Sequence, residues 1–393
     1  MDALYAGKYA QVVEVLDELD IDLWLVMGRE TVDVCDPGLR LVFPSNIMGV
    51  SAFFFTRDGR RRALVRRKDV EGVKETGCFD EVVGYADDFD ELLGATIAEI
   101  DPNVIDIDVD LHDALTDGLT AGLYLRLLAA LDGTPYRDRI SYGRAIRSIR
   151  GRKTEEEIAL QTDVLKLLNQ ACAELSEQVR PGTTEEWVWE YCQRFMREHN
   201  LTSSWENEAC PLVHAGARSN QGLVHPSATN AVQPGDVFHL SFGAKHPSGY
   251  ATDFQRSWYV FEPGETTVPE EVQAAFDATV AAIDHTRRTM RPGDEGRYVN
   301  KIFNERLAGF DASGGGHAVG RALHDGCFQL AGDSKVIGKL PEVKLEVGNV
   351  FTLEVFCTTS RGVIGVEEMI RLTPDGGEYL YIPQRELWTL PSA

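Results

Sequence analysis

The sequence lacks long hydrophobic runs and is poor in basic residues. No stretch of about 18 residues is uninterrupted by polar or charged side chains, which argues against a membrane-spanning helix. The 393 residues include 39 Lys and Arg against 62 Asp and Glu, a formal net charge of −23 at pH 7. So acidic a surface repels phosphate groups and anionic lipid headgroups. We therefore expect neither nucleic acid nor a membrane as a partner.

Cysteines are also few, and none lies in a CxxC pair. They are odd in number and scattered along the chain, at Cys35, Cys78, Cys172, Cys192, Cys210, Cys327 and Cys357. This pattern favours reduced thiols, most of them buried as small apolar side chains. The first twenty residues have neither the basic region nor the apolar region of a signal peptide. Together these features predict a cytoplasmic protein.

What is present is typical of a globular chain with more than one domain. Hydrophobic residues make up 43% and charged residues 26%, and the length suggests two or three domains. Helical and strand patterns alternate in the first part, with strands expected at 23–27, 51–56, 62–66 and 104–109 and helices at 9–19 and 119–131. We predict an α/β domain over residues 1–150. The turn-rich, basic stretch 132–153 is interpreted as the connection between domains.

A second domain is predicted over residues 151–393. Its first helix begins cleanly, because Thr154 and Glu157 form a capping box in which each side chain can bond the other residue's backbone N–H. Further helices are expected at 185–198 and 270–290, with strands between and after them.

Two segments of this second domain repeat each other. Residues 235–241 (GDVFHLS) resemble residues 348–354 (GNVFTLE), and each is followed by a second strand that carries an acid. Asp253 follows Ser241 by 12 residues, and Glu367 follows Glu354 by 13. The repeat predicts two similar β-hairpins in a pseudo-symmetric domain, with a site between its halves.

The acids of these hairpins can point into one cleft together with a histidine. Side chains on paired strands share a face, so Glu354, Glu367 and Asp253 can converge. His317 follows three glycines, which let the backbone approach closely. Each residue alone is more typical of a surface acid or a buried histidine. As an ordered set, carboxylates with one imidazole suit a divalent ion such as Mn, Co, Fe or Zn.

In this order, the motifs resemble those of the methionine aminopeptidase, prolidase and creatinase family. The segments that carry the resemblance are Pro234-Gly235-Asp236, Phe242-Gly243-Ala244, Asp253-Phe254-Gln255-Arg256, Gly316-His317, His324-Asp325, Thr352-Leu353-Glu354 and Glu367-Glu368. The resemblance implies an α+β chain, in which a creatinase-like α/β domain (1–150) precedes a pita-bread catalytic domain (151–393). It is closest to two-domain members of the Xaa-Pro dipeptidase or aminopeptidase type.

The resemblance also implies roles for individual residues. Four fall on the family's metal-ligand positions: Asp253, His317, Glu354 and Glu367. Glu354 is also expected to act in catalysis, together with His225 and His324, whose imidazoles suit acid–base work because they change charge near neutral pH. The family further implies a homodimer.

The match breaks at two positions. Ser241 stands where the family has its first bridging Asp, and a serine hydroxyl is a poor ligand for these cations, so one ion or none is expected. His239 alternates onto the same face and is an alternative ligand. Gly365 lies where proline peptidases commonly have an arginine, and nothing in the sequence indicates that Arg321 or Arg361 replaces it.

Three hypotheses follow. The first is a metal-dependent peptidase that cleaves a small Xaa-Pro peptide, with a depleted metal site. The second is a metal-independent, creatinase-like hydrolase of a small nitrogen-rich substrate, with His225 as the base. The third is a non-catalytic member of the family. Retention of Asp253, His317, Glu354 and Glu367 favours the first.

Overall fold

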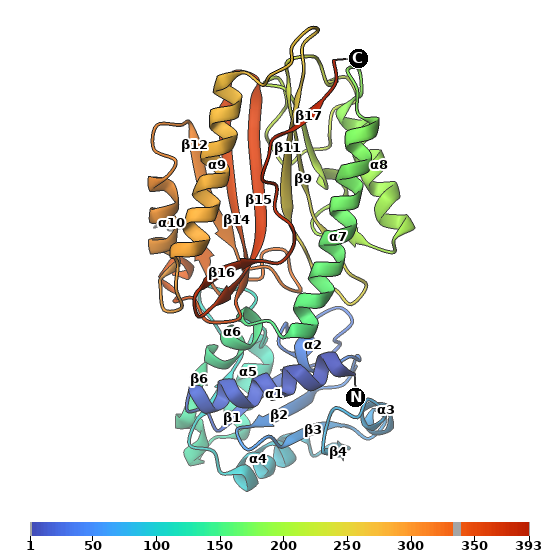
Figure 1. Ribbon diagram of the computed structural model, residues 1–393. Helices are drawn as coiled ribbons and strands as arrows, with labels where there is room; N and C mark the ends of the chain where they lie inside the picture. Colours follow the sequence, from blue (N-terminus) through green and yellow to red (C-terminus); the bar gives the residue numbers. More distant parts are fainter. Residues whose placement is uncertain (1, 333–338, 393) are drawn as a thin grey trace. The chain divides into compact units, whose positions relative to one another are not determined.

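The chain divides into two compact units in the computed structural model (Figure 1), which describes residues 2–332 and 339–392. The first unit is Met1–Glu156 and the second is Glu157–Ala393. No helix in the described residues is both long enough and apolar enough to span a membrane.

The first unit is a mixed sheet covered by helices on both faces. The strands lie in the order β4-β3-β2-β1-β5-β6, and their bounds are β1 Leu23–Gly28, β2 Ser51–Thr56, β3 Arg61–Arg66, β4 Glu81–Tyr85, β5 Ile105–Ile107 and β6 Ile140–Tyr142. The helices are α1 Ala3–Glu18, α2 Leu39–Val42, α3 Val70–Glu75, α4 Phe89–Ile100, α5 Ala121–Ala130 and α6 Arg144–Gly151, with a 3₁₀ turn at Pro135–Arg139.

Strands β1 and β2 are buried along their whole length because each face of the sheet has its own core. Phe53 and Phe55 of β2 pack into one core, with α1 and α6, and Phe54 points into the other, with α4 and α5. Burial on both faces explains why these strands are continuous apolar runs rather than alternating patterns.

The interpretation of residues 132–153 as an interdomain connection is wrong. This stretch contains β6, which pairs in parallel with β5, and α6, which buries Ile146 and Ile149 in the core of the first unit. Strand β6 has three residues, which are too few to show a periodic pattern. The arginines of α6 made its sequence read as basic, so that its apolar face was not recognised. Two of them lie at its edge, where Arg144 donates to the Leu19 carbonyl and Arg147 pairs with Asp110.

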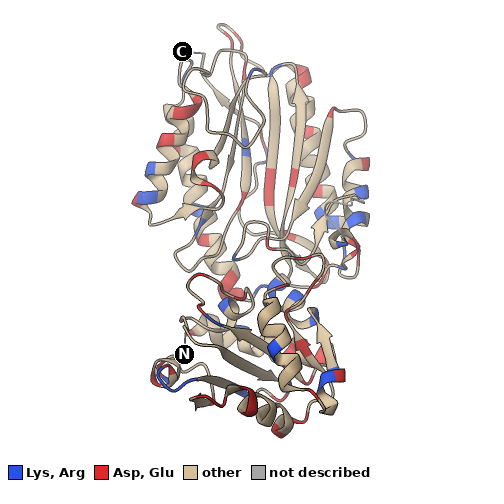
Figure 2. Ribbon diagram, turned by 180° about the vertical axis from the view of Figure 1, so that it is seen from behind, with Lys and Arg blue, Asp and Glu red and all other residues tan. Residues whose placement is uncertain are grey.

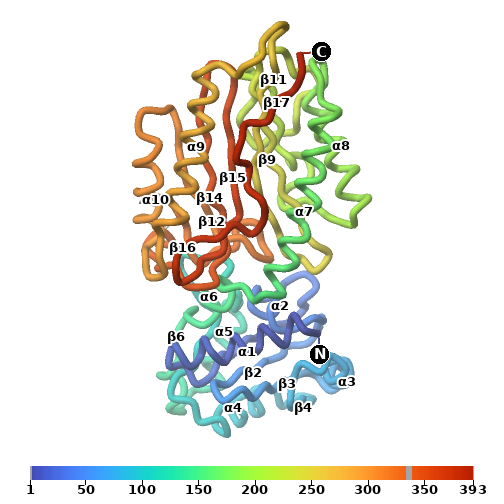
Figure 3. Tube along the Cα trace, viewed as in Figure 1, coloured from blue at the N-terminus to red at the C-terminus, as the bar shows by residue number. Residues whose placement is uncertain are grey.

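The second unit is built on a larger sheet. Its strands lie in the order β13-β12-β14-β15-β11-β9-β8, with β16 beside β15 and β17 beside β11. The bounds are β8 Leu212–Ala215, β9 Val237–Phe242, β11 Phe254–Val260, β12 Ala312–His317, β13 Gln329–Leu330, β14 Val350–Thr359, β15 Gly362–Thr373, β16 Gly376–Tyr379 and β17 Trp388–Leu390. A separate pair is formed by β7 Thr202–Ser203 and β10 Ala244–Lys245. The chain trace in Figure 3 shows the last segment returning to lie beside β11.

Two helices pack on each half of this sheet (Figure 1). Helices α7 (Glu155–Gln178) and α8 (Glu185–Glu198) share a core with β8, β9 and β11. Helices α9 (Glu270–Thr289) and α10 (Gly296–Glu305) share another with β12, β14 and β15. Short 3₁₀ turns lie at Asn207–Ala209 and Leu340–Glu342. The predicted pseudo-symmetric, pita-bread arrangement is confirmed.

The two repeated hairpins meet at the centre of the sheet, where β11 pairs with β15. Ser241 lies opposite Gln255, Gln255 lies opposite Glu367, and Glu367 lies opposite Glu354. One row of side chains therefore crosses four strands. In register, the counterpart of Glu367 in the first hairpin is Gln255, whereas Asp253 precedes the strand by one residue.

Candidate metal centre

Three residues from different strands converge at the centre of the second unit. Asp253 lies just before β11, His317 ends β12, and Glu367 lies within β15. One ligand atom from each lies within 4.8 Å of the others, and all three residues are buried. His317 Nε2 is 3.7 Å from Asp253 Oδ2 and 3.9 Å from Glu367 Oε1. These separations are too long for hydrogen bonds and leave room for an ion between them.

The donor atoms of this cluster fit a cation. Asp253 Oδ1 and Glu367 Oε1 are buried without a hydrogen-bond partner. His317 Nδ1 lies 3.2 Å from the Ala318 carbonyl, to which it can donate, so the lone pair of the neutral ring lies on Nε2 and faces the carboxylates. Buried acceptors facing one another without a donor are costly, and a divalent cation would satisfy all of them.

Burial and mutual repulsion perturb every titratable group of the cluster. Desolvation and the charge of Glu354 raise the pKa of Asp253 well above its usual range. Desolvation and the charges of Asp253 and Glu354 do the same to the pKa of Glu367. Burial raises the pKa of Glu354 to about 7, and burial with the nearby His324 lowers that of His317 to about 3. Without a cation, the folded chain therefore disfavours the charged form of all four groups.

Glu354 lies at the edge of this cluster. It is directly opposite Glu367 on β14, and its Oε2 accepts from Gln255 Nε2 at 3.3 Å. Its charge raises the pKa of both Asp253 and Glu367, which places its carboxylate within electrostatic reach of them. The four residues predicted as ligands are thus gathered in one region.

The two predicted acid–base histidines lie in different surroundings. The His324 ring is edge-on to His317, with 4.3 Å between centroids, and desolvation lowers its pKa. His225 instead lies 3.0 Å from the Glu208 carbonyl and 3.3 Å from Glu186. Among the described residues, no hydrogen bond or ion pair joins His225 to the cluster; it borders a cavity of about 450 Å³ that His214 also lines.

Gln255, His239 and His214 form a hydrogen-bonded chain of side chains. The sequence predicted His239 only as an alternative ligand and did not point to Gln255 or His214. Gln255 Nε2 is 3.0 Å from Glu367 Oε2, and its Oε1 is 2.9 Å from His239 Nε2. His239 Nδ1 is in turn 2.9 Å from His214 Nδ1. Both nitrogens of His239 are therefore engaged outside the Asp253, His317 and Glu367 cluster. A strand position two residues after Asp253 shares its face, and this spacing is the signal that could have identified Gln255.

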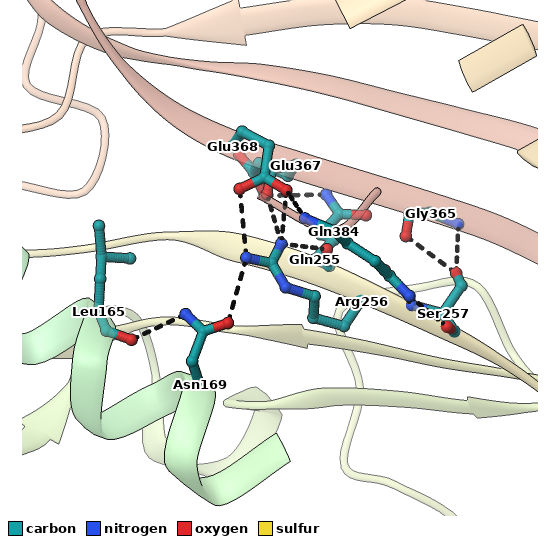
Figure 4. A network of polar contacts seen from close by, with 9 residues as sticks. All are labelled: Leu165, Asn169, Gln255, Arg256, Ser257, Gly365, Glu367, Glu368 and Gln384. Carbon is teal, nitrogen blue, oxygen red and sulfur yellow. Dashed lines mark hydrogen bonds and ion pairs between the residues drawn. The ribbon is translucent and has the colours of Figure 1, made fainter. Parts of the chain in front are cut away.

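The second acid of the Glu367-Glu368 pair has a structural partner instead (Figure 4). Arg256 Nη1 and Nη2 lie 3.0 and 3.2 Å from the two oxygens of Glu368, and Nη1 also donates to the Glu367 carbonyl at 3.1 Å. Asn169 of α7 contacts the same guanidinium. This buried ion pair, between side chains 2% and 6% exposed, joins β11 to β15 next to the cluster.

The two arginines considered as replacements for the one missing at position 365 have other contacts. Arg361 pairs with Glu262 at 2.7 Å, and Arg321 lies over the Tyr250 ring at 5.2 Å from its centroid.

Comparisons with known proteins agree with this geometry. Residues 160–374, more than half of the chain, match the profile of Metallopeptidase family M24. Over 274 residues the chain is 25% identical to the uncharacterized peptidase YqhT of Bacillus subtilis, covering 69% of this chain and 72% of that protein.

Solved structures share the fold along nearly the whole chain. The Xaa-Pro dipeptidase from Bacillus anthracis has a TM-score of 0.67 and 21% identity, covering 98% of this chain and 100% of that one. The X-Pro aminopeptidase from Thermotoga maritima has a TM-score of 0.65 and 20% identity, covering 96% and 100%. At these identities the structures bear on the fold alone. The profile match identifies the family, and the buried cluster of Asp, His and Glu agrees with it. The chain belongs to metallopeptidase family M24 and is a hydrolase of the peptidase class.

Proposed function

We propose that this chain is a metal-dependent peptidase of the Xaa-Pro dipeptidase or aminopeptidase type, with a depleted metal site. One observation carries the proposal: Asp253, His317 and Glu367 present buried ligand atoms to one another, and two of the carboxylate oxygens have no hydrogen-bond partner. The M24 family and the fold shared with an Xaa-Pro dipeptidase support it.

Asp253, His317, Glu354 and Glu367 would hold a divalent ion of Mn, Co, Fe or Zn. When bound, such an ion supplies an acidified water and a polarised carbonyl. Glu354 would take the proton of the attacking water and return it to the leaving amine. A carboxylate can serve in both steps, because it accepts a proton in the first and releases it in the second.

The two histidines would act on the substrate from different sides. His324 lies beside His317 and would hydrogen-bond the substrate carbonyl or the tetrahedral intermediate. His225 borders the cavity of about 450 Å³, and a peptide end entering there would meet its ring. Selectivity for proline is a separate question, because Gly365 offers no side chain to bind the substrate.

Metal content and hydrolysis of a dipeptide panel test the proposal together. Protein purified without chelator is expected to contain Mn, Co, Fe or Zn, and added metal should increase hydrolysis. His317→Ala should lose both the ion and more than about 100-fold in activity, since loss of a ligand should exceed the effect of losing a supporting contact. His285→Ala, a change on α9, should leave both unchanged. The absence of both bound metal and metal-stimulated hydrolysis would contradict the proposal.

The creatinase-like alternative makes a different prediction. There His225 would be the essential base, so His225→Ala would abolish turnover of a nitrogen-rich substrate whatever the metal content. Turnover that survives this substitution but is lost in His317→Ala rejects the alternative. Turnover lost in His317→Ala also rejects a non-catalytic role.

The remaining expectations stay predictions. These are the cytoplasmic location, the homodimer, the assignment of residues 1–150 and 151–393 to the two domains of the family, and the small peptide as substrate.

A further inference from the structure

Glu367 divides its two oxygens between different partners. Oε1 faces His317 and has no hydrogen-bond donor. Oε2 accepts from the amide nitrogen of Gln255 at 3.0 Å, and the same nitrogen lies 3.3 Å from Glu354 Oε2. A carboxylate that bridges two cations uses one oxygen for each. Here the second oxygen of Glu367 already has a hydrogen donor.

The orientation of the Gln255 amide is determined by its other end. Its carbonyl oxygen lies 2.9 Å from His239 Nε2, and the opposite orientation would place that oxygen against two carboxylates. His239 must then donate from Nε2 and accept at Nδ1, where His214 Nδ1 lies at 2.9 Å. Burial lowers the pKa of His239 to about 3, which agrees with a neutral ring. The chain of three side chains therefore keeps the amide hydrogens directed at the acids.

Gly365 provides the space for this arrangement. A Cβ at position 365 would lie 2.1 Å from His239 Nε2 and 2.6 Å from Gln255 Oε1, both far inside van der Waals contact. Two departures from the family pattern, the glycine at 365 and the serine at 241, therefore adjoin the same series of hydrogen-bonded side chains. Ser241 lies directly opposite Gln255 on the neighbouring strand.

We propose that the Gln255 amide takes the place of a second cation, so that this centre holds one divalent ion per chain. The inference rests on the proposed function and concerns the number of ions rather than their presence. It assigns the single ion to the side where Asp253, His317 and Glu367 Oε1 converge. It also predicts that restoring the acid at position 241 is not sufficient for a second ion, because the Gln255 amide would still hydrogen-bond Glu367 Oε2 and Glu354 Oε2, the oxygens that a second ion would need.

The number of bound ions in four proteins tests this. Each is dialysed against excess Mn²⁺, then against metal-free buffer, and analysed for manganese per chain. We expect one ion in the unmodified chain, one in Ser241→Asp, one in Gln255→Met, and two in the double variant Ser241→Asp with Gln255→Met. Met matches the length of Gln but has no N–H.

Gln384 offers a matched control. It is also a buried glutamine beside β11, but its side chain hydrogen-bonds the backbone of Ser257 rather than Glu354 or Glu367. Ser241→Asp with Gln384→Met should therefore bind one ion. Circular dichroism establishes that each variant is folded, and Gln255→Ser repeats the test should the Met variant unfold.

Three results would overturn the inference. These are two ions in the unmodified chain, two ions in Ser241→Asp alone, or one ion in the folded double variant. The first two do not depend on a new variant at 255. They leave the metal-dependent peptidase activity intact, although two ions in the unmodified chain would contradict a depleted site. No ion in the unmodified chain, with no metal-stimulated hydrolysis, would instead reject the proposed function and this inference with it.

Discussion

At the scale of the residue, the centre is a set of buried acids with no positively charged side chain paired to them among the described residues. Asp253 and Glu367 are buried, and among the described residues neither pairs with a lysine or an arginine. The nearest buried guanidinium, Arg256, is used by Glu368. His317 is kept neutral by burial, so it cannot compensate either. The fold therefore tolerates these acids either as protonated groups or around a cation.

The stability of metal-stripped protein should depend on pH through Glu354. Its pKa in the fold is about 7 against an ordinary value of 4.5, so the folded state prefers the protonated carboxyl. This contribution to stability is fully present below about pH 4.5, declines as pH rises, and is lost above about pH 7. Burial lowers the pKa of His239 and His317 to about 3, which acts in the opposite direction over part of this range, so the test is a difference between proteins. Between about pH 5 and pH 8, the melting temperature of the chelated protein should fall relative to that of equally chelated Glu354→Gln.

Two comparisons isolate this effect from the general repulsion of an acidic chain. Glu354→Gln, without a titratable group, should show a shallower fall when it is also stripped of metal. Metal-loaded protein should also show a shallower fall, because a cation stabilises the carboxylate form. Equal slopes in all three samples would contradict the prediction.

At the scale of the element, the two hairpins explain why the site lies at the middle of the sheet. Strands β11 and β15 pair with each other, which brings residues more than a hundred positions apart into one row. Figure 2 shows acidic residues on central strands of this sheet as well as on the helices. A strand residue and the one two positions on share a face, so the His239 and Gln255 side chains lie beside the acids.

Gly365→Ala should destabilise the second unit through its contact with His239. The added Cβ would overlap the imidazole, and overpacking of this kind costs about 1–3 kcal/mol in the free energy of unfolding. Combining it with His239→Ala removes the nearer of the two atoms that it overlaps, so the loss in the double variant should be smaller than the sum of the two single losses. Urea unfolding measures all three. Simple additivity of the two single changes would contradict the contact.

Arg256→Met should destabilise the chain by about 3–5 kcal/mol, because it leaves the carboxylate of Glu368 buried without its partner. Lys166→Met provides the control. It removes an ion pair with Asp163 in which both side chains are more than half exposed, and should cost less than about 1 kcal/mol. Chemical denaturation compares the two. A loss in Arg256→Met as small as in the control would show that this ion pair contributes little to the stability of the second unit.

At the scale of the whole molecule, each unit has its own hydrophobic cores and the acidic balance lies mainly on the surface. The clusters within 1–156 and those within 157–393 share no residue. Acidic and basic residues are spread over both units rather than collected in one region (Figure 2). Of the 62 acids, the candidate centre uses Asp253, Glu354 and Glu367. The net charge of −23 therefore bears on partners and solubility rather than on the chemistry of the site.

The seven cysteines allow a test of the packing of both units. None forms a disulfide, six are buried, and Cys35 is partly exposed. Burial raises the pKa of Cys172 to about 12, which suppresses its thiolate as well as its access to reagent. A thiol reagent should therefore label about one cysteine quickly in native protein and all seven in denaturant. Rapid labelling of several would contradict the packing.

Much of the architecture could be predicted from the sequence. Helix Glu185–Glu198 and strand Ser51–Thr56 have the expected bounds, because each is delimited by a strong local signal: a cap at Thr184 for the helix and a turn for the strand. The motifs around Asp253, His317, Glu354 and Glu367 identified the family, which the profile match confirms. Strand β6 was missed because its three residues are defined by pairing with β5 rather than by their own pattern.

The sequence by itself determined the fold class, the family and the absence of an acid at Ser241, since these depend on residue types and their order. Only the tertiary structure decided what occupies the space beside that serine. The register across β9, β11 and β15 places Gln255 opposite both Ser241 and Glu367. Gly365 leaves room for His239, which orients the side-chain amide of Gln255. The physical reason is that hydrogen-bond partners on different strands are determined by pairing, which residue order does not specify.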